Sequence, residues 1–149
     1  MRLNNGFDIS ASALTAQRLR LDVVASNIAN ANTTRGELVN GKWVPYTRKL
    51  VELQSRNPDA FQDILNQKIT EKTGQGVRVS QIYNDPTPYK TVYDPTNPDA
   101  DENGNVQMPN VDIMKEMVDM ISASRSYEAN VTALNASKNM VTKSLEIGK

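Results

Sequence analysis

The sequence predicts an α+β fold, in which two terminal helices form an antiparallel coiled-coil-like pair and a small β-rich insert occupies the middle of the chain. Each end of the chain carries a long segment with apolar residues at heptad spacing, and such a stripe needs a partner helix. Between these segments, Pro, Gly and Asn cluster and separate short runs that resemble strands. We therefore expect the two ends of the chain to meet in space.

The first expected element is a helix from about residue 7 to residue 32, within an N-terminal helical segment of residues 1–35. Ala, Leu and Arg, which favour helices, are frequent over this stretch. Its apolar stripe comprises Phe7, Leu14, Leu21, Val24 and Ile28. Gly36 follows the last apolar position and is expected to end the helical segment.

The β-rich insert is expected over residues 36–109, and its clearest local signal is the dipeptide Asn40-Gly41. This dipeptide favours the positive backbone dihedral angles of a type I′ turn. Short runs at residues 37–39 and 42–44 flank it on either side. The sequence therefore predicts a β-hairpin at the start of the insert.

Turn residues predict the remaining elements of the insert. Strands are expected over residues 46–53, 77–80 and 89–93. Asn57-Pro58 is typical of a helix cap followed by proline at the first helical position, which predicts a short helix near residues 58–72. Residues 94–109 contain three prolines and clustered Asp and Asn, so we expect a loop there.

The last expected element is a helix within residues 110–149, with Asn110 as its N-cap. Ser124 and Lys138 interrupt its stripe, which otherwise keeps 4-3 spacing. The apolar members of the stripe are Ile113, Met117, Met120, Tyr127, Val131, Leu134, Val141 and Leu145. We expect this stripe and that of the first helix to form the seam of the helical pair.

The composition excludes several classes of function. The 149 residues include no Cys and no His, which excludes disulfides, thiolate metal sites and Ser-His or Cys-His catalysis. Lys and Arg number 17, as do Asp and Glu, so no net field favours nucleic acid or anionic lipid. An enzyme with a carboxylate-only site in the insert has no motif behind it. We therefore assign no catalytic residue, cofactor or metal ligand.

The sequence also carries no targeting signal that we recognise. No apolar run approaches the roughly 18 residues that a membrane span needs, so we expect no membrane insertion. Ala11 and Ala13 imitate a signal-peptidase site, but Asp8 and Ser10 interrupt the apolar region that should precede it. We expect no cleaved signal peptide.

One segment of the insert is typical of the first half of a calcium-binding loop. Asp99, Asp101 and Asn103 stand at the first, third and fifth positions, and Gly104 at the sixth. The twelfth position is Asn110, which cannot supply the bidentate carboxylate that such loops need. A surface loop is the better interpretation, and a calcium-binding module stays as an alternative.

The two ends of the chain resemble a known family. The stretch Ser12-Ala-Leu-Thr-Ala-Gln-Arg-Leu-Arg-Leu-Asp-Val-Val-Ala-Ser-Asn-Ile-Ala-Asn-Ala-Asn-Thr-Thr resembles the shared start of bacterial flagellar rod and hook proteins. Pro109-Asn-Val-Asp, Glu116-Met-Val and Ser124-Arg-Ser-Tyr-Glu-Ala-Asn-Val resemble their shared end. Between them, Pro45-Tyr-Thr-Arg-Lys and Asp94-Pro, followed by Pro98-Asp-Ala-Asp, are similar to the proximal-rod members.

The resemblance implies a non-catalytic structural subunit of the flagellar proximal rod in the basal body. It would polymerise through its terminal helices and help to transmit motor torque to the hook. The implied partners are other rod proteins, copies of itself in a helical assembly, and the flagellar type III export apparatus, which would pass the chain across the inner membrane without cleavage. A neighbouring rod paralogue of the same family is the alternative identity.

In such an assembly, each stripe would be only partly covered within one chain and would be completed by the next subunit. We therefore expect the seam residues to be interface residues. Polar contacts between subunits are expected from Asn27, Asn30, Tyr127, Glu128 and Asn130.

Overall fold

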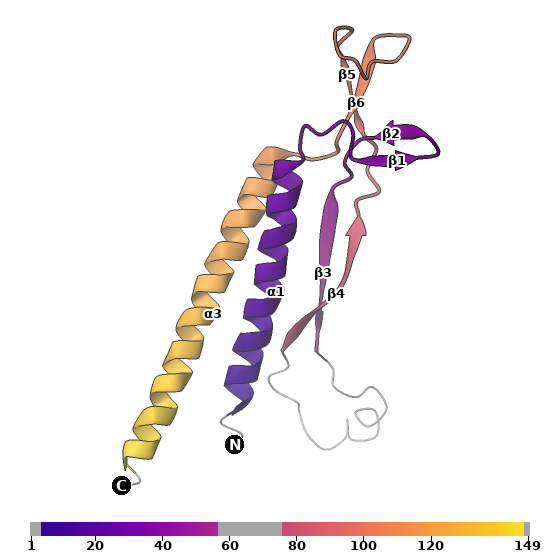
Figure 1. Ribbon diagram of the computed structural model, residues 1–149. Coiled ribbons are helices and arrows are strands. Elements are labelled where there is room, and N and C mark those ends of the chain that lie inside the picture. The colour runs from indigo at the N-terminus through magenta and orange to yellow at the C-terminus, as the bar shows by residue number, and fades with distance from the viewer. Residues whose placement is uncertain (1–3, 57–75, 148–149) are drawn as a thin grey trace. The chain divides into compact units, whose positions relative to one another are not determined.

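The computed structural model describes residues 4–56 and 76–147. In chain order, the elements are α1 (Asn4–Ala29), β1 (Glu37–Val39), β2 (Lys42–Val44), β3 (Lys49–Ser55), β4 (Val77–Asn84), β5 (Lys90–Tyr93), β6 (Asn105–Met108) and α3 (Ile113–Ile147) (Figure 1). The predicted α+β class, with a helix at each end and antiparallel strand pairs between them, is confirmed. The helix predicted near residues 58–72 lies outside the described residues.

The chain forms two compact units. Unit 1 comprises Met1–Leu19, Glu52–Gln81 and Ala123–Lys149, and unit 2 comprises Arg20–Val51 and Ile82–Ser122. Both helices and the β3–β4 pair contribute to each unit, because the boundary between the units falls within these elements.

The terminal helices pack against one another in an antiparallel direction. In unit 1, a methyl group built on Gly6 would lie 3.6 Å from Ser137 Oγ. In unit 2, Arg20 forms an ion pair with Asp119, at 3.6 Å. Residue 6 of α1 thus lies near residue 137 of α3, and residue 20 lies near residue 119. Residue numbers along α3 decrease as those along α1 increase, so the helices run in opposite directions, as predicted.

The predicted hairpin at the start of the insert is confirmed. β1 pairs with β2 in the register Glu37↔Val44, Leu38↔Trp43 and Val39↔Lys42, which leaves a two-residue turn. Asn40 and Gly41 have φ values of 52° and 79°, as a type I′ turn requires.

The ribbon of β3 and β4 begins three residues later than predicted, at Lys49 rather than Tyr46. At one end of the ribbon, Asp85 N donates to Arg48 O at 2.8 Å. The backbone N–H of Arg48 donates to the Asn110 side chain and not to a neighbouring strand. Only one of the two backbone groups of Arg48, its carbonyl, therefore pairs as in a strand. A contact with Asn110, which is far from Arg48 in sequence, therefore determines where β3 starts.

The prediction of a loop over the whole of residues 94–109 is wrong, because residues 105–108 form β6. This strand pairs with β5 in the register Lys90↔Met108, Thr91↔Gln107, Val92↔Val106 and Tyr93↔Asn105. Val106 is only 2% exposed. The prolines and acidic residues of the segment concentrate in the connection between β5 and β6. Their number favoured the prediction of a loop and obscured the short strand that follows.

The predicted N-cap of the last helix is also wrong. Asp112, not Asn110, caps α3: its Oδ1 accepts from Met114 N at 3.1 Å. Asn110 is buried and bonds to other parts of the chain. In the part of the chain that is described, neither helix is long and apolar enough to cross a membrane.

Candidate functional site

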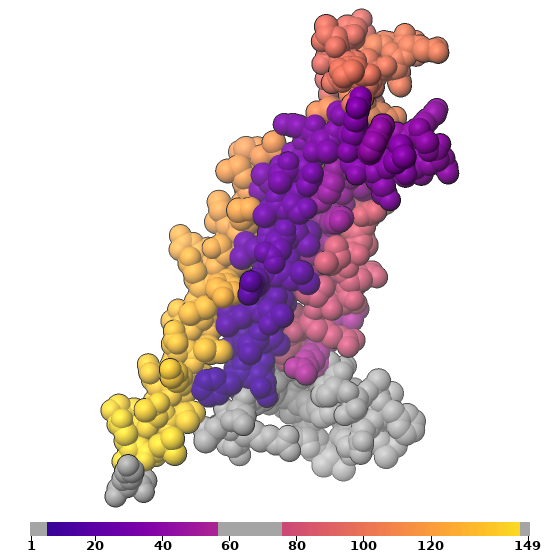
Figure 2. All heavy atoms as spheres, in the orientation of Figure 1, coloured from indigo at the N-terminus to yellow at the C-terminus, as the bar shows by residue number. Residues whose placement is uncertain are grey.

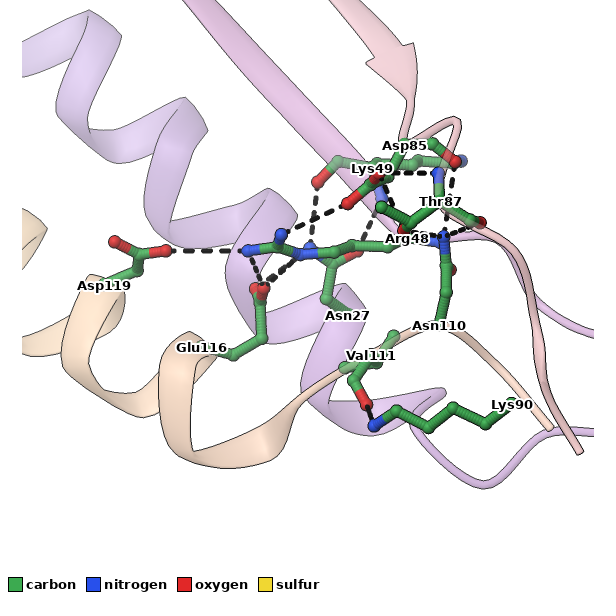
Figure 3. A network of polar contacts seen from close by, with 10 residues as sticks. All are labelled: Asn27, Arg48, Lys49, Asp85, Thr87, Lys90, Asn110, Val111, Glu116 and Asp119. Atoms are coloured by element: carbon green, nitrogen blue, oxygen red, sulfur yellow. Dashed lines mark hydrogen bonds and ion pairs between the residues drawn. The ribbon is translucent and has the colours of Figure 1, made fainter. Parts of the chain in front are cut away.

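The most extensive buried polar network lies in unit 2 and involves Asn27, Arg48, Asp85, Asn110 and Glu116, which we call the Arg48 cluster (Figure 3). Its members come from α1, the start of β3, the segment after β4, the segment before α3, and α3 itself. The surrounding core is made of small residues, so polar contacts carry much of the packing between these segments. The buried hydrophobic residues of unit 2 are Val23, Val24, Ala31, Val106 and Val111.

Asn27 joins α1 to both β3 and α3. Its Nδ2 donates to Lys49 O and to Glu116 Oε2, each at 2.9 Å. Its Oδ1 accepts from Lys49 N and from the Tyr46 hydroxyl, each at 3.0 Å. The side chain is 1% exposed, and these contacts fill the two donor and two acceptor positions of an amide. It thus pairs with the backbone of Lys49 much as a neighbouring strand would.

Arg48 holds the buried carboxylate of Glu116, which is 1% exposed. Its Nε and Nη2 both lie 2.6 Å from Glu116 Oε1, and its Nη1 lies 3.2 Å from Asp85 Oδ2. Burial alone would lower the pKa of Arg48, but the hydrogen bonds and charges of Glu116 and Asp85 outweigh it and raise that pKa. The guanidinium therefore stays charged and compensates two carboxylates that burial would otherwise destabilise.

Asp85 is 9% exposed and remains ionised for a local reason. The backbone N–H of Thr87, 3.0 Å from Asp85 Oδ1, contributes most to lowering the pKa of Asp85. Burial opposes this effect, while the Thr87 hydroxyl and the Arg48 guanidinium reinforce it. The Asp-Pro-Thr sequence thus forms a turn that presents a carboxylate to Arg48.

Asn110 connects the remaining segments. Its Oδ1 accepts from Arg48 N at 2.8 Å, and its Nδ2 donates to Asp85 O at 3.2 Å and Thr87 O at 3.0 Å. Nearby, Lys90 Nζ donates to Val111 O at 2.7 Å. The cluster therefore ties both terminal helices to the insert through side-chain amides and charges.

Except for Val24, the predicted seam residues of α1 lie beside its most buried positions. Val24 is buried, whereas Phe7, Leu14, Leu21 and Ile28 are half-buried. The helix also contacts the β3–β4 ribbon, because Ser12 Oγ accepts from Val77 N at 3.0 Å in unit 1.

On α3, the most buried positions are Glu116 and Ala123, each one residue before a member of the predicted stripe. Ile113, Met117 and Leu145 are 42%, 47% and 70% exposed. The half-buried members of the stripe are Met120, Tyr127, Val131, Leu134 and Val141. That these residues contact a neighbouring subunit stays a prediction.

The other residues that were predicted to make polar contacts between subunits bond within their own helix or are exposed or half-buried. Asn30 Nδ2 donates to Ser26 O at 2.9 Å, and Asn130 Nδ2 donates to Ser126 O at 2.8 Å. Glu128 is exposed and pairs with Arg125 at 3.4 Å. Tyr127 is half-buried. Their role between subunits, like that of Asn27, also stays a prediction.

The calcium-like segment uses its first carboxylate for an ion pair. Arg35 Nη2 lies 2.6 Å from Asp99 Oδ1, and the Thr34 hydroxyl lies 2.8 Å from Asp99 Oδ2. The hydrogen bond from Arg35 is the main reason that the pKa of Asp99 is lowered. Among the described residues, no three His, Cys, Asp or Glu side chains gather as a metal would need.

Sequence reasoning did not single out Arg48, Asp85 or the structural role of Asn110. The Asp-Pro-Thr turn could have indicated a preorganised carboxylate, and Arg48 lies in one of the segments that carry the family resemblance. Glu116 gave no comparable signal, since an acidic residue in the first turns of a helix is also explained by the helix dipole.

Comparison with known proteins gives consistent matches over the whole chain. Residues 7–35 match a family described as "Flagella basal body rod protein", and residues 102–147 match "Flagellar basal body rod FlgEFG protein C-terminal". The chain is 57% identical to the flagellar basal-body rod protein FlgC of Bacillus subtilis, over 97% of both chains. Identity is 47% to FlgC of Yersinia enterocolitica, over the full length of both, and 42% to FlgC of Borreliella burgdorferi, over 99% of this chain and 98% of the relative.

Proposed function

The chain belongs to the family of flagellar basal-body rod proteins, and from this premise we infer that it is a structural subunit of the rod in the bacterial flagellar basal body. The similarity to FlgC relatives over at least 97% of both chains is the observation that carries this conclusion. We propose further that the subunit belongs to the proximal part of the rod.

Assembly through the terminal helices is the mechanism that the packing supports best. Leu21 and Leu134 are only half-buried, and Leu145 is 70% exposed. A helical pair with open apolar positions gains stability when neighbouring subunits cover it. A tube needs head-to-tail contacts of this kind, which propagate rather than close.

The Arg48 cluster supports a mechanical role. Its charge-assisted hydrogen bonds of 2.6 Å connect α3 to the start of β3, and Asn27 connects α1 to both. Force applied to the insert would therefore pass to both helices through short polar contacts. We propose that this connection helps the rod to transmit motor torque to the hook.

A non-catalytic role and passage through the flagellar export apparatus complete the proposal. The absence of His and Cys supports the first, because the commonest general base and the strongest nucleophile are missing. It is also compatible with the second, because a chain without Cys forms no disulfide that would block export in an unfolded state. Partners would be the export apparatus, other rod proteins and copies of this chain.

Deletion of the gene, scored by electron microscopy of purified basal bodies, tests the proposal. We expect basal bodies without a complete rod, and recovery when the gene is restored on a plasmid. A complete rod in the deletion strain contradicts the assignment. Cross-linking in the restored strain identifies the neighbouring rod proteins, and neighbours confined to the distal rod would indicate a different rod paralogue.

A further inference from the structure

The chain contains the dipeptide Asn-Gly three times, at residues 5–6, 40–41 and 103–104. This dipeptide is chemically reactive, because glycine has no side chain to hinder attack by its backbone nitrogen on the side-chain carbonyl of the preceding asparagine. The first copy lies in the opening turn of α1. The other two belong to the hairpins of unit 2, one in the β1–β2 turn and one in the connection between β5 and β6.

The reaction is a deamidation in which water is the co-reactant. At residues 40–41, the backbone nitrogen of Gly41 would lose its proton to a base in the solvent and attack Cγ of Asn40. A C–N bond forms to this carbon, its bond to the amide nitrogen breaks, and ammonia leaves. Water then opens the five-membered succinimide ring. Attack at Cγ gives aspartate, and attack at the backbone carbonyl carbon gives isoaspartate, in which the main chain passes through the former side chain.

Both reacting groups are accessible at the β1–β2 turn. Asn40 and Gly41 are exposed, and a methyl group built on Gly41 would meet no atom within 4 Å beyond its chain neighbours. Within the part of the chain that the structure describes, the Gly41 N–H donates no hydrogen bond. Figure 1 shows this turn at the end of the hairpin, and Figure 2 shows the hairpin projecting from the surface. Base and water can therefore reach the turn.

The β1–β2 hairpin must open locally before the ring can close. In a type I′ turn, the nitrogen of the second residue lies nearly opposite the side chain of the first across the Cα–C bond, so Gly41 N is turned away from Asn40 Cγ. Opening requires little free energy here, because each strand has only three residues and all of them except Val44 are exposed. Short two-stranded hairpins are marginally stable in water.

The same dipeptide at residues 103–104 is held by folded contacts. Gly104 N donates to Asp101 O at 2.8 Å, and Gly104 O accepts from Asp94 N at 3.0 Å. A methyl group built on Gly104 would lie 3.0 Å from Tyr93 Cε2 and 3.3 Å from Pro95 Cβ. The attacking nitrogen is thus engaged, and local opening would disrupt both hydrogen bonds and this packing.

We propose that Asn40 is a site of spontaneous deamidation in the folded chain, and that the contacts of Gly104 protect Asn103. Isoaspartate at position 40 adds a backbone atom to the two-residue turn, so type I′ geometry and the pairing of Leu38 with Trp43 are lost. Aspartate keeps the turn, since Asp-Gly also fits type I′. Deamidation at this position is therefore a slow chemical change that loosens the hairpin.

Incubation of the purified full-length chain at mildly alkaline pH, followed by peptide mapping with mass spectrometry, tests the proposal. We expect Asn40 to react at least about tenfold faster than Asn103, because the two sites differ in the free energy of local opening. In urea, where the folded contacts are absent, both should react at similar rates. Equal rates in the folded chain overturn the proposal. A difference that persists in urea also overturns it, because local sequence and not the fold would then be responsible.

Tryptophan fluorescence gives a second measurement, since Trp43 is the only Trp of the chain and lies in the hairpin. As isoaspartate accumulates, Trp43 should lose its pairing with Leu38, and its emission should move to longer wavelength. Asn40→Gly removes the reactive amide and keeps a Gly-Gly turn that fits type I′, so its emission should stay constant during the same incubation. Asn103→Gly is the matched control and should leave the reaction at Asn40 unchanged. An equal shift in Asn40→Gly would show that deamidation of Asn40 does not loosen the hairpin.

Discussion

At the scale of single residues, Arg48 is the side chain on which most of the buried charge depends. Arg48→Met leaves Glu116, which is 1% exposed, without a counter-charge. Removing one partner of a buried pair typically costs about 3–5 kcal/mol, so we expect a large fall in the free energy of unfolding, measured by urea titration of the purified chain. Arg125→Met removes an exposed pair with Glu128 and should cost at most about 1 kcal/mol. Equal effects of the two changes would contradict the role of Arg48.

Asp85 gives the chain a specific sensitivity to acid. The backbone N–H of Thr87 is the main cause of its lowered pKa. A carboxyl group whose pKa is lower in the folded state contributes stability above its unfolded pKa, ordinarily 3.8, and loses it as pH falls through the folded value. Stability should therefore decline as pH falls below about 4.

The comparison variant is Asp85→Asn. It should be less stable than the wild type at neutral pH, and its urea midpoint should change less between neutral pH and pH 3. If the wild type and the variant lose the same increment of stability on acidification, Asp85 is not the responsible group.

At the scale of elements, the helix seam can be tested by adding charge. Leu21 and Leu134 are half-buried members of the two predicted stripes. Leu21→Asp combined with Leu134→Asp places carboxylates where apolar surface should be covered, and we expect loss of rod assembly and of swimming. Thr15→Asp with Ala133→Asp adds the same charge at exposed positions of the same helices and should leave both intact. Normal swimming of the Leu21 and Leu134 variant would show that the seam does not matter in assembly.

The sequence predicted those elements that are determined by residues close together in the chain. Asn40-Gly41 determines the first hairpin because a type I′ turn needs positive φ at both positions. β6 was missed because Asn105-Val-Gln-Met alternates polar and apolar residues over only four positions, between Gly104 and Pro109, and its pairing with β5 supplies the stabilisation. The heptads located both helices correctly, but α1 contacts the β3–β4 ribbon as well as α3. A heptad stripe, which assumes one partner helix, therefore could not indicate which residues of α1 are the most buried.

The Arg48 cluster could not be predicted for a related reason. Arg48, Asp85 and Glu116 come from segments far apart in sequence, and each has an ordinary explanation when it is considered alone. Asn110 illustrates the difficulty: an Asn at the start of a helix suggests a cap. The structure instead uses its amide to connect Arg48 with Thr87. Only the fold that brings these segments together distinguishes the two roles.

At the scale of the whole molecule, the balance of charge indicates which force drives association. The formal net charge is zero, with 17 basic and 17 acidic side chains, so copies neither attract nor repel one another through a net field. The uncovered positions are instead apolar, including Met114 at 71% and Val118 at 65% exposure. Burial of apolar surface is insensitive to screening of charges and is strengthened by salts such as sulfate.

Self-association of the purified chain should therefore hold in sodium chloride and increase in ammonium sulfate, as measured by sedimentation velocity. Between about 0.1 M and 1 M salt the Debye length falls from about 10 Å to about 3 Å, which would weaken contacts that depend mainly on exposed charges. Met114→Ser combined with Val118→Ser should reduce the association in sulfate, because it removes apolar area at two exposed positions on the first turns of α3. Dissociation as sodium chloride rises would instead assign the association to contacts between charged side chains of neighbouring copies.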